Sequence, residues 1–370
     1  MYIWERPQWP RFRWDADALI GPLAQASRRQ GRFLGQLARL GFDLQRETQL
    51  GALTEDAVKS SEIEGESLNR EDVRSSFARR LGIPQPDAKR ADRRAEGIAE
   101  MLLDATQNFD HPLTTGRLWR WQAALFPEGE ARLRRVKTGA WREDAEGPMR
   151  VISGPVGRER VHFEAPPASR VADEMRELLD WFNDWFNAPR AQVGLLRAGL
   201  VHLWFVTIHP FDDGNGRIAR ALTDMALSQL EGSGQRFYGL SRQIEKERRE
   251  YYNSLETTQR GDLDVTGWLD WFVGCHMRAV EDAEVLSEAV LRRAQFWMRL
   301  SDEVFTVRQK KVLNRCLDGL EGALTAKKWA AIGNCSPASA LRDINDLLER
   351  GVLKRLPGGS KNTKYDLAFE

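Results

Sequence analysis

Twelve consecutive residues, His209 to Arg220, contain the side chains needed to hold phosphate groups beside an attacking hydroxyl. His209 follows an apolar segment. Its imidazole titrates near neutral pH (unperturbed pKa about 6.5), so it could take a proton from a hydroxyl. Gly214, Asn215 and Gly216 form a turn that leads into a helix, where backbone N–H groups bind anions. The run predicts a phosphate site with a general base beside it.

The same run supplies two further kinds of group that suit a nucleotide. Arg217 and Arg220 are three residues apart, hence on one helix face, and arginine binds phosphate oxygens well. Asp213 is a hard oxygen ligand beside the anion site. Because Mg²⁺ binds through one or two carboxylates plus substrate phosphates, we expect Mg²⁺ at Asp213 and phosphates at the arginines.

The composition limits the class of protein. The 370 residues allow two or three domains. With 55 basic and 54 acidic side chains the net charge is +1, so nucleic-acid binding would need a local patch. The three cysteines lie far apart, which favours neither a zinc site nor a disulfide framework. No signal-peptide pattern begins the chain, and no apolar run approaches the ~18–20 residues of a membrane span. We therefore expect a cytoplasmic protein with no membrane partner.

Helical spacing of apolar residues over most of the chain predicts an all-α fold. The expected helices span 15–44, 54–60, 71–80, 91–106, 115–125, 168–186, 191–207, 215–230, 241–259 and 266–298. The exception is the segment 148–163, where two β-prone runs around a Gly-Pro-Val-Gly turn predict a hairpin. Helices over 307–320, 325–332 and 336–350, followed by a second hairpin, have the order of a winged helix-turn-helix. The expected division is 1–85, 86–300 and 301–370.

The run from His209 to Arg220 resembles the signature H-x-F-x-[DE]-G-N-G-R-x-x-R of the Fic (filamentation induced by cAMP) family at every fixed position. The resemblance implies a helical bundle and transfer of AMP from ATP to a Ser, Thr or Tyr hydroxyl of a target protein, or of the protein itself. It implies that His209 is the general base, that Asp213 holds Mg²⁺, and that the Gly214–Gly216 turn lines the anion hole. Arg217 would then contact phosphates, and Arg220 the γ-phosphate.

The resemblance extends to two other segments of the central domain. The hairpin looks like the family's flap, which adds a strand to the target segment by main-chain pairing. Its docking residues would be Val151, Ile152, Ser153 and Gly154. The stretch Gly139 to Arg142 also resembles a recurrent sequence of the family's core. Tyr252 could pack on adenine and Asn253 could bond it, although ordinary core packing explains these residues equally well.

The pattern S-x-x-x-E-G at Ser60 to Gly65 resembles the inhibitory helix of the family, placed here before the core at about residues 54–65. Glu64 would pair with Arg220 and take the space and charge that the γ-phosphate needs. Ser60, four residues earlier on the same helix face, would anchor that geometry. The resemblance therefore implies a weak resting enzyme, whereas the bare pattern is also that of a charged helix end capped by glycine.

Three functions remain open at this point: an autoinhibited AMP transferase, a DNA-binding regulator that senses nucleotide or modifies itself, and a de-AMPylating hydrolase or a transferase with another donor. The residues from Trp4 to Pro10 resemble the N-terminal extension of one bacterial Fic subgroup that also carries a C-terminal winged helix. A homodimer is a further expectation from the family. DNA would meet basic residues of the C-terminal module: Arg342, Lys354, Arg355, Lys361 and Lys364. Acidic residues on the same helix oppose DNA binding and favour a protein-interaction module: Asp343, Asp346 and Glu349.

Overall fold

The structure, a computed structural model, describes residues 1–84, 92–127, 136–145, 147–155, 157–184, 194–317, 320, 322–357 and 363–368. Within these residues the chain is predominantly helical with two small antiparallel sheets, as predicted. It divides into two compact units, one of residues 1–35 and 45–284, the other of residues 36–44 and 285–370. The three-part division expected from the sequence stays a prediction. Among the described residues, no helix combines the length and apolarity needed to span a membrane.

The elements follow one another in this order along the chain. The first half contains η1 (Ile3–Glu5), α1 (Ala16–Leu37), α2 (Phe42–Ile63), α3 (Arg70–Arg80), α4 (Arg93–Gln107), α5 (Thr115–Leu125), β1 (Arg150–Ser153), β2 (Arg160–Glu164) and α6 (Ala168–Asn183). The second half contains α7 (Gly194–Ile208), α8 (Asn215–Glu231), α9 (Leu240–Lys246), α10 (Arg248–Gln259), α11 (Thr266–Arg299), α12 (Val307–Leu317), α13 (Ala326–Gly333), α14 (Pro337–Glu349), β3 (Leu353–Arg355) and β4 (Tyr365–Leu367).

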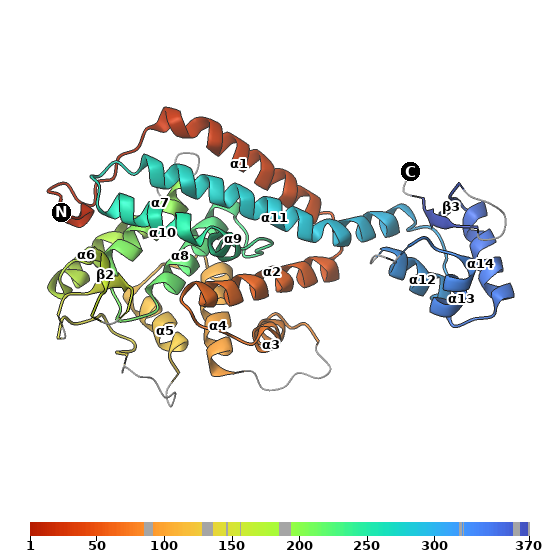
Figure 1. Cartoon of the computed structure of the whole chain (residues 1–370), viewed down its shortest axis with the longest axis horizontal. Helices are drawn as coiled ribbons and strands as arrows, with labels where there is room; N and C mark the ends of the chain where they lie inside the picture. The colour runs from red at the N-terminus through yellow and green to blue at the C-terminus, as the bar shows by residue number, and fades with distance from the viewer. Residues whose placement is uncertain are drawn as a thin grey trace. The chain divides into compact units, whose positions relative to one another are not determined.

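Helices α7 and α8 form the centre of the first unit and pack against each other (Figure 1). α7 is predominantly apolar, and its residues from Leu195 to Ile208 are all buried, as in a helix surrounded by others. Gly214 and Gly232 flank α8 with φ of +89° and +62°, a left-handed conformation that glycine adopts without steric cost. The loop of residues 209–214 is thus fixed at both ends by buried helices.

The N-terminal segment braces the elements around this centre. The indole of Trp4 donates to the carbonyl of Glu164 at the end of β2 (2.7 Å), and the indole of Trp9 donates to Glu174 on α6 (2.7 Å). Arg13 then forms a parallel bridge with Asp264, just before α11. Figure 1 shows α1 lying along α11, where Arg29 pairs with the carboxylates of Glu281 and Glu284. The first residues therefore support the flap from outside.

The helix that carries the predicted inhibitory segment is longer than expected. α2 begins at Phe42, not at Thr54, and the helix predicted over 15–44 ends at Leu37. Thr54 is buried inside α2, where its hydroxyl donates to the carbonyl of Leu50 (2.6 Å) instead of capping a helix start. The helix predicted over 241–259 is two helices in the structure, α9 and α10.

The second unit contains three short helices and the antiparallel pair β3–β4. Thr325 caps α13, and Ser336 caps α14 with proline at the next position. Leu324 adds an isolated bridge to Tyr365. The core of this unit includes Val312, Leu313, Trp329, Ile344, Leu347 and Val352. The order of elements agrees with the expected one, its identity as a winged helix stays a prediction, and Lys361 lies outside the described residues.

Candidate active site

The loop between α7 and α8 begins with a residue in an unusual backbone conformation. The N–H of His209 still donates to the carbonyl of Phe205 (2.9 Å), but its φ is +52°. Left-handed backbone is uncommon for residues other than glycine and is enriched at functional sites. Pro210 follows and cannot continue the helix. The chain therefore leaves α7 abruptly, with the imidazole at the turning point.

Asn215 holds this loop in shape from within. Its side chain accepts from the N–H of Phe211 (3.0 Å) and donates to the Phe211 carbonyl (2.8 Å), so both polar atoms are used. The Phe211 ring is fully buried and packs on Trp141, with ring centroids 5.0 Å apart. The Asn215 side chain thus shapes the loop, and its backbone N–H is the part that remains for the predicted anion hole.

Arg142 fixes the same loop from the outside. Its N–H donates to the carbonyl of Pro210 (2.9 Å) and its Nε to the carbonyl of His209 (2.8 Å). Its Nη1 pairs with Asp144 at 2.7 Å. The sequence pointed to this residue only through the resemblance of the Gly139–Arg142 stretch, and its task as a positioning residue was not foreseen.

The contacts of His209 settle which ring nitrogen is available. Its Nδ1 lies 3.2 Å from the carbonyl of Val206, an acceptor, so Nδ1 carries the proton. Burial lowers the pKa of His209 below its ordinary value, although the Val206 carbonyl and the carboxylates of Glu64 and Asp213 oppose this. At neutral pH the ring is therefore uncharged, and Nε2 has the lone pair that a general base needs.

Both predicted arginines of α8 are buried and already engaged by acidic or polar groups. Arg217 pairs with Glu66 (2.6 Å), and its Nη2 lies 3.5 Å from Asp213 Oδ1. Arg220 donates through Nε to the hydroxyl of Ser60 (2.8 Å), and through Nη2 to the Ser60 carbonyl (2.8 Å). Ser60, which the sequence predicted as an anchor for the inhibitory geometry, is thus brought together with Arg220, although 160 positions separate them.

Some donors of these arginines have no acceptor among the described residues. They are Nε of Arg217 and Nη1 of Arg220, and both residues are only 2% exposed. A buried guanidinium N–H without an acceptor costs free energy, on the order of 1–3 kcal/mol. Oxygens of a phosphate group would satisfy such donors. These donors therefore make the site suitable for binding an anion such as a phosphate group.

Glu64 supplies one carboxylate to this anion site. Its Oε1 accepts from Arg220 Nη2 at 2.7 Å, and the side chain is 28% exposed. A Cβ atom built on Gly216 would lie 2.1 Å from the same Oε1, so only glycine permits this approach to the start of α8. Burial opposes ionisation of Glu64, but the charge and hydrogen bond of Arg220 outweigh it and lower its pKa. Glu64 is thus an ionised group at the helix N-terminus, where an external anion would bind.

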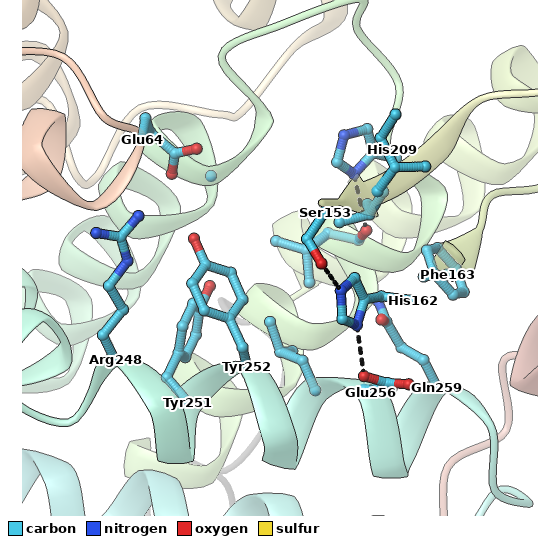
Figure 2. A pocket seen from close by; sticks show the side chains of 15 residues that line it. Glu64, Ser153, His162, Phe163, His209, Arg248, Tyr251, Tyr252, Glu256 and Gln259 are labelled. Atoms are coloured by element: carbon cyan, nitrogen blue, oxygen red, sulfur yellow. Dashed lines mark hydrogen bonds and ion pairs between the residues drawn. The ribbon is translucent and has the colours of Figure 1, made fainter. Parts of the chain in front are cut away.

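A cavity of about 390 Å³ joins these groups to the flap (Figure 2). Figure 2 shows Glu64 and His209 across the cavity from each other, with Tyr252 between them and the helix α10 below. The predicted residues that line it are Glu64, Val151, Ile152, Ser153, His209, Gly216 and Tyr252. His209, the N-terminus of α8 and the hairpin therefore open into one space of nucleotide size.

The two predicted adenine-binding residues differ in position. Tyr252 lines the cavity, is 40% exposed, and its hydroxyl lies 3.4 Å from the carbonyl of Ile63. Asn253 is exposed and is not among the lining residues, so the structure does not bring it to the site. Its neighbour Tyr251 lines the cavity instead, with its hydroxyl bonded to His202 (2.9 Å). Arg248 also lines the cavity and donates to the Ile63 carbonyl (2.7 Å), which sequence reasoning missed.

The hairpin is present where the sequence predicts it. β1 and β2 pair antiparallel, and Gly154 follows β1 with a φ of +103° that favours glycine. Two residues of this region were not foreseen, His162 on β2 and Glu256 on α10, and both line the cavity. His162 Nδ1 lies 2.7 Å from a carboxylate oxygen of Glu256. No spacing in the sequence links these two, since 94 positions separate them.

Asp213 is the expected magnesium ligand. Its side chain is 45% exposed and accepts from the N–H of Gly214 (2.6 Å) at the start of α8. Within the described part of the chain, no cluster of three or more His, Cys, Asp or Glu side chains could hold a metal ion by itself. One carboxylate beside an anion site fits a magnesium ion that arrives with nucleotide phosphates.

Comparison with protein families matches residues 112–227 to the Fic/DOC family and residues 2–83 to a domain of unknown function (DUF4172). A solved structure of a Fic family protein from Desulfovibrio desulfuricans G20 is similar in fold, with a TM-score of 0.55. It is 21% identical, and the similarity covers 95% of this chain and 96% of that one.

Curated relatives match a quarter to a third of the chain. Protein adenylyltransferase fic-1 of Caenorhabditis briggsae is 37% identical over 93 residues, which are 25% of this chain and 17% of that protein. The Caenorhabditis elegans protein of the same name is 33% identical over 117 residues, 32% and 21% of the two chains. A uridine 5'-monophosphate transferase of Xanthomonas campestris is 28% identical over 123 residues, again 32% and 21%. The matches span about a fifth of the length of these relatives.

Proposed function

We propose that the protein transfers AMP from ATP to a protein hydroxyl under control of Glu64, on the premise that residues 112–227, which match the Fic/DOC family, form its catalytic domain. The observation that carries the proposal is the ion pair between Glu64 and Arg220 at the N-terminus of α8 (2.7 Å). It puts the protein's own carboxylate at an anion site that shares a cavity with His209. The names of the relatives, protein adenylyltransferases, support the same reaction.

In the proposed reaction His209 Nε2 takes the proton of the target hydroxyl. The hydroxyl oxygen forms a bond to the α-phosphorus of ATP, the bond from that phosphorus to the α,β-bridging oxygen breaks, and pyrophosphate leaves. A neutral imidazole with Nδ1 bonded to the Val206 carbonyl suits this task. Backbone N–H groups from Gly214 to Gly216 and the donors of Arg217 bind phosphate oxygens as negative charge develops.

Asp213 would hold Mg²⁺ in this site. When bound, the ion neutralises phosphate charge and orients the pyrophosphate leaving group. Asp213 itself is positioned by the N–H of Gly214 and by Arg217, which keeps the carboxylate at the mouth of the anion site.

The resting protein is proposed to be held inactive by its own α2 segment. Ser60 and Glu64 take three hydrogen bonds from Arg220, at 2.7–2.8 Å, so that this arginine cannot grip a γ-phosphate. The negative charge of Glu64 also repels the phosphate that would replace it. Nucleotide bound beside it would not present its α-phosphorus in line with the hydroxyl.

The flap would position the target. β1 has solvent-exposed residues Ile152 (54%) and Ser153, and its edge is one to which an extended target segment could add a strand. Main-chain pairing of this kind tolerates many side chains, so the target hydroxyl would be selected by position along the strand. Val151, Ile152, Ser153 and Gly154 are the proposed docking residues.

The reaction is tested with ATP labelled on the α- or the γ-phosphate, with magnesium and a cell lysate. We expect protein-bound label from α-labelled ATP only, and a loss of roughly 10²–10⁴-fold in the His209→Ala variant. Label transferred from the γ-phosphate, or full activity without His209, would contradict the proposal. Competition between ATP and UTP decides the base, since one relative is named a uridine 5'-monophosphate transferase. Release of AMP from labelled protein would favour the de-AMPylating alternative.

A second candidate function, DNA binding by the module of α12 to β4, has one observation in its favour. The negative charge of Asp343 would oppose DNA binding if it were on the surface. The residue is only 7% exposed, however, and pairs with Arg308 (2.6 Å). Its carboxylate also accepts from the indole of Trp329 (3.0 Å), so it faces the core. Arg342 is exposed on α14. A salt-dependent mobility shift with genomic fragments, lost in Arg342→Ala, would support this function; no shift at low salt would exclude it.

A further inference from the structure

A hydroxyl, an imidazole and a carboxylate form a relay on the cavity side of the flap. Ser153 Oγ lies 2.6 Å from His162 Nε2, and His162 Nδ1 lies 2.7 Å from Glu256 Oε2. Figure 2 shows the three side chains in line, from β1 through β2 to α10, with His209 above Ser153. A serine, a base and an orienting acid in this order are the parts of an activated nucleophile.

The charge of Glu256 sets the direction of the relay. The hydrogen bond from His162, with the hydrogen bond and positive charge of Arg160 (2.9 Å), keeps the pKa of Glu256 below its ordinary value despite partial burial. An ionised carboxylate only accepts, so His162 Nδ1 is the donor. In the neutral ring Nε2 is then an acceptor, and the Ser153 hydroxyl donates to it. The imidazole is thus ready to take the proton of Ser153.

An irregularity in the hairpin brings these residues together. Val151 pairs with Phe163, but the next residue, Ile152, pairs with Val161, so His162 is an extra residue on β2. In a regular ladder His162 would lie opposite Ile152, on the face away from Ser153. An extra residue of this kind re-aims side chains and is often found beside active sites. The relay is therefore a product of the hairpin's irregular register.

The relay is held against the cavity that contains the general base. Arg260 on the C-terminal side of α10 donates to the carbonyls of Val161 (2.8 Å) and His162 (3.1 Å), which ties β2 to that helix. Ser153, His162 and His209 all line the same cavity of about 390 Å³. A nucleotide seated at the anion site of α8 would thus share its enclosure with the Ser153 hydroxyl.

We propose that Ser153 is a self-modification site, whose hydroxyl attacks the α-phosphorus of ATP held in this cavity. The Ser153 oxygen forms a bond to that phosphorus, pyrophosphate leaves with the α,β-bridging oxygen, and the hydroxyl proton passes to His162 Nε2. The product is AMP esterified to the flap. This inference rests on the proposed transfer of AMP by the same site, and adds an acceptor that belongs to the chain itself.

The sequence around Ser153 makes a direct test available. Trypsin cleaves after Arg150 and Arg158, and the peptide between these sites, residues 151–158, contains Ser153 as its only hydroxyl. The full chain with Glu64→Gly, incubated with ATP and magnesium and then digested, should yield this peptide with one added adenylyl group. The added mass should be absent in Ser153→Ala and persist in Ser169→Ala, which changes an exposed serine of α6 outside the cavity lining.

Variants of the relay separate a chemical role of His162 from a merely structural one. His162→Gln should lower adenylylation of the 151–158 peptide by roughly a hundredfold, while transfer to lysate proteins falls far less. Glu256→Gln should lower it less than His162→Gln, since the imidazole remains. An equal fall of both readouts would mean that His162 only holds the flap, and would overturn the relay. If AMP is found on other peptides but never on 151–158, Ser153 is not the acceptor. If no AMP is found on any protein, the proposed function itself is contradicted.

Discussion

At the scale of single residues, the N-terminus of α8 is an anion site filled by the protein's own carboxylate. The carboxylate of Glu64 occupies the space that the missing side chain of Gly216 leaves open. Arg220 donates to it through Nη2, whereas Nη1 of Arg220 has no acceptor among the described residues. His209, in the same cavity, is kept neutral by burial. In the proposed reaction Glu64 must leave Arg220 before that arginine can bind a phosphate.

The lowered pKa of His209 leads to a prediction about pH. A general base must be deprotonated, so transfer is lost as pH falls through the pKa of His209. Since burial holds that pKa below the ordinary ~6.5, kcat/KM for ATP should stay constant from pH 8 to below 6.5 and fall only at lower pH. The profile is measured with the Glu64→Gly variant, whose missing carboxylate lowers the pKa further. An acid limb with its midpoint above 6.5 would contradict a buried, neutral base.

The bracing of the loop by Asn215 leads to a prediction about stability. Asn215→Ala leaves the buried N–H and carbonyl of Phe211 without their partner, which should cost about 1–3 kcal/mol in the free energy of unfolding. Asn253→Ala, at an exposed asparagine, is the matched control and should stay within about 0.5 kcal/mol. Urea denaturation of both variants measures the difference. Equal stability of the two would show that Asn215 does not brace the loop.

Residues with a local pattern were predictable from the sequence, and residues joined only by the fold were not. His209, Gly214 and Arg220 lie in one continuous run whose spacing determines their chemistry. The relay of His162 and Glu256 depends on the pairing of a strand with a distant helix, which no local spacing encodes. Asn253 does not line the cavity, because the face of α10 that meets the cavity presents Tyr251 and Tyr252.

At the scale of elements, α2 is fixed to the catalytic core at two points before it presents Glu64. Asp56 accepts from the N–H (2.8 Å) and the hydroxyl (3.0 Å) of Ser241, and so caps α9 from a different helix. Arg248, at the start of α10, donates to the Ile63 carbonyl immediately before Glu64. The length of α2 was mispredicted because Thr54 has the residue type of a helix cap but the environment of a helix interior.

The contact at the end of α2 can be tested by substituting each of two neighbouring arginines in turn. Arg248→Ala removes the donor to Ile63 and should let Glu64 leave Arg220 more often, raising transfer at saturating ATP by up to about tenfold, since one charged hydrogen bond is worth roughly 1.5 kcal/mol. Arg249→Ala, the exposed neighbour, should leave the rate unchanged. Initial rates with α-labelled ATP measure both. If the two variants behave alike, Arg248 does not retain the inhibitory segment.

At the scale of the whole molecule, all the residues assigned to AMP transfer belong to one of the two compact units. The cavity, the flap, α8 and the end of α2 lie within residues 45–284, and the three helices with β3–β4 belong to the other unit. Each unit has its own buried tryptophan, Trp268 in the first and Trp329 in the second. Composition alone could suggest several domains, but it could not tell which of them carries the chemistry.

Substitution of these tryptophans should separate the units. Trp329→Ala removes a fully buried ring and should destabilise the second unit by about 3–5 kcal/mol, with transfer of α-label within twofold of the parent protein. Trp268→Ala, whose ring lies 5.6 Å from that of His202, the hydrogen-bond partner of the cavity-lining Tyr251, should lower both stability and transfer. Thermal unfolding and transfer rates are measured on the same samples. A large loss of transfer in Trp329→Ala would refute the assignment of activity to one unit.

The most direct test of the account compares the Glu64→Gly and Glu62→Gly variants by initial rates of AMP incorporation from α-labelled ATP. Both variants put glycine near the end of α2, but Glu62 pairs with Lys59 (2.6 Å) and only Glu64 bonds Arg220. A hydrogen bond between charged groups is worth about 1.5–3 kcal/mol, so Glu64→Gly should raise the rate by roughly ten- to a hundredfold. Glu62→Gly should leave it near that of the parent protein. Equal rates for Glu64→Gly and the parent protein would contradict the claim that this carboxylate holds the site inactive.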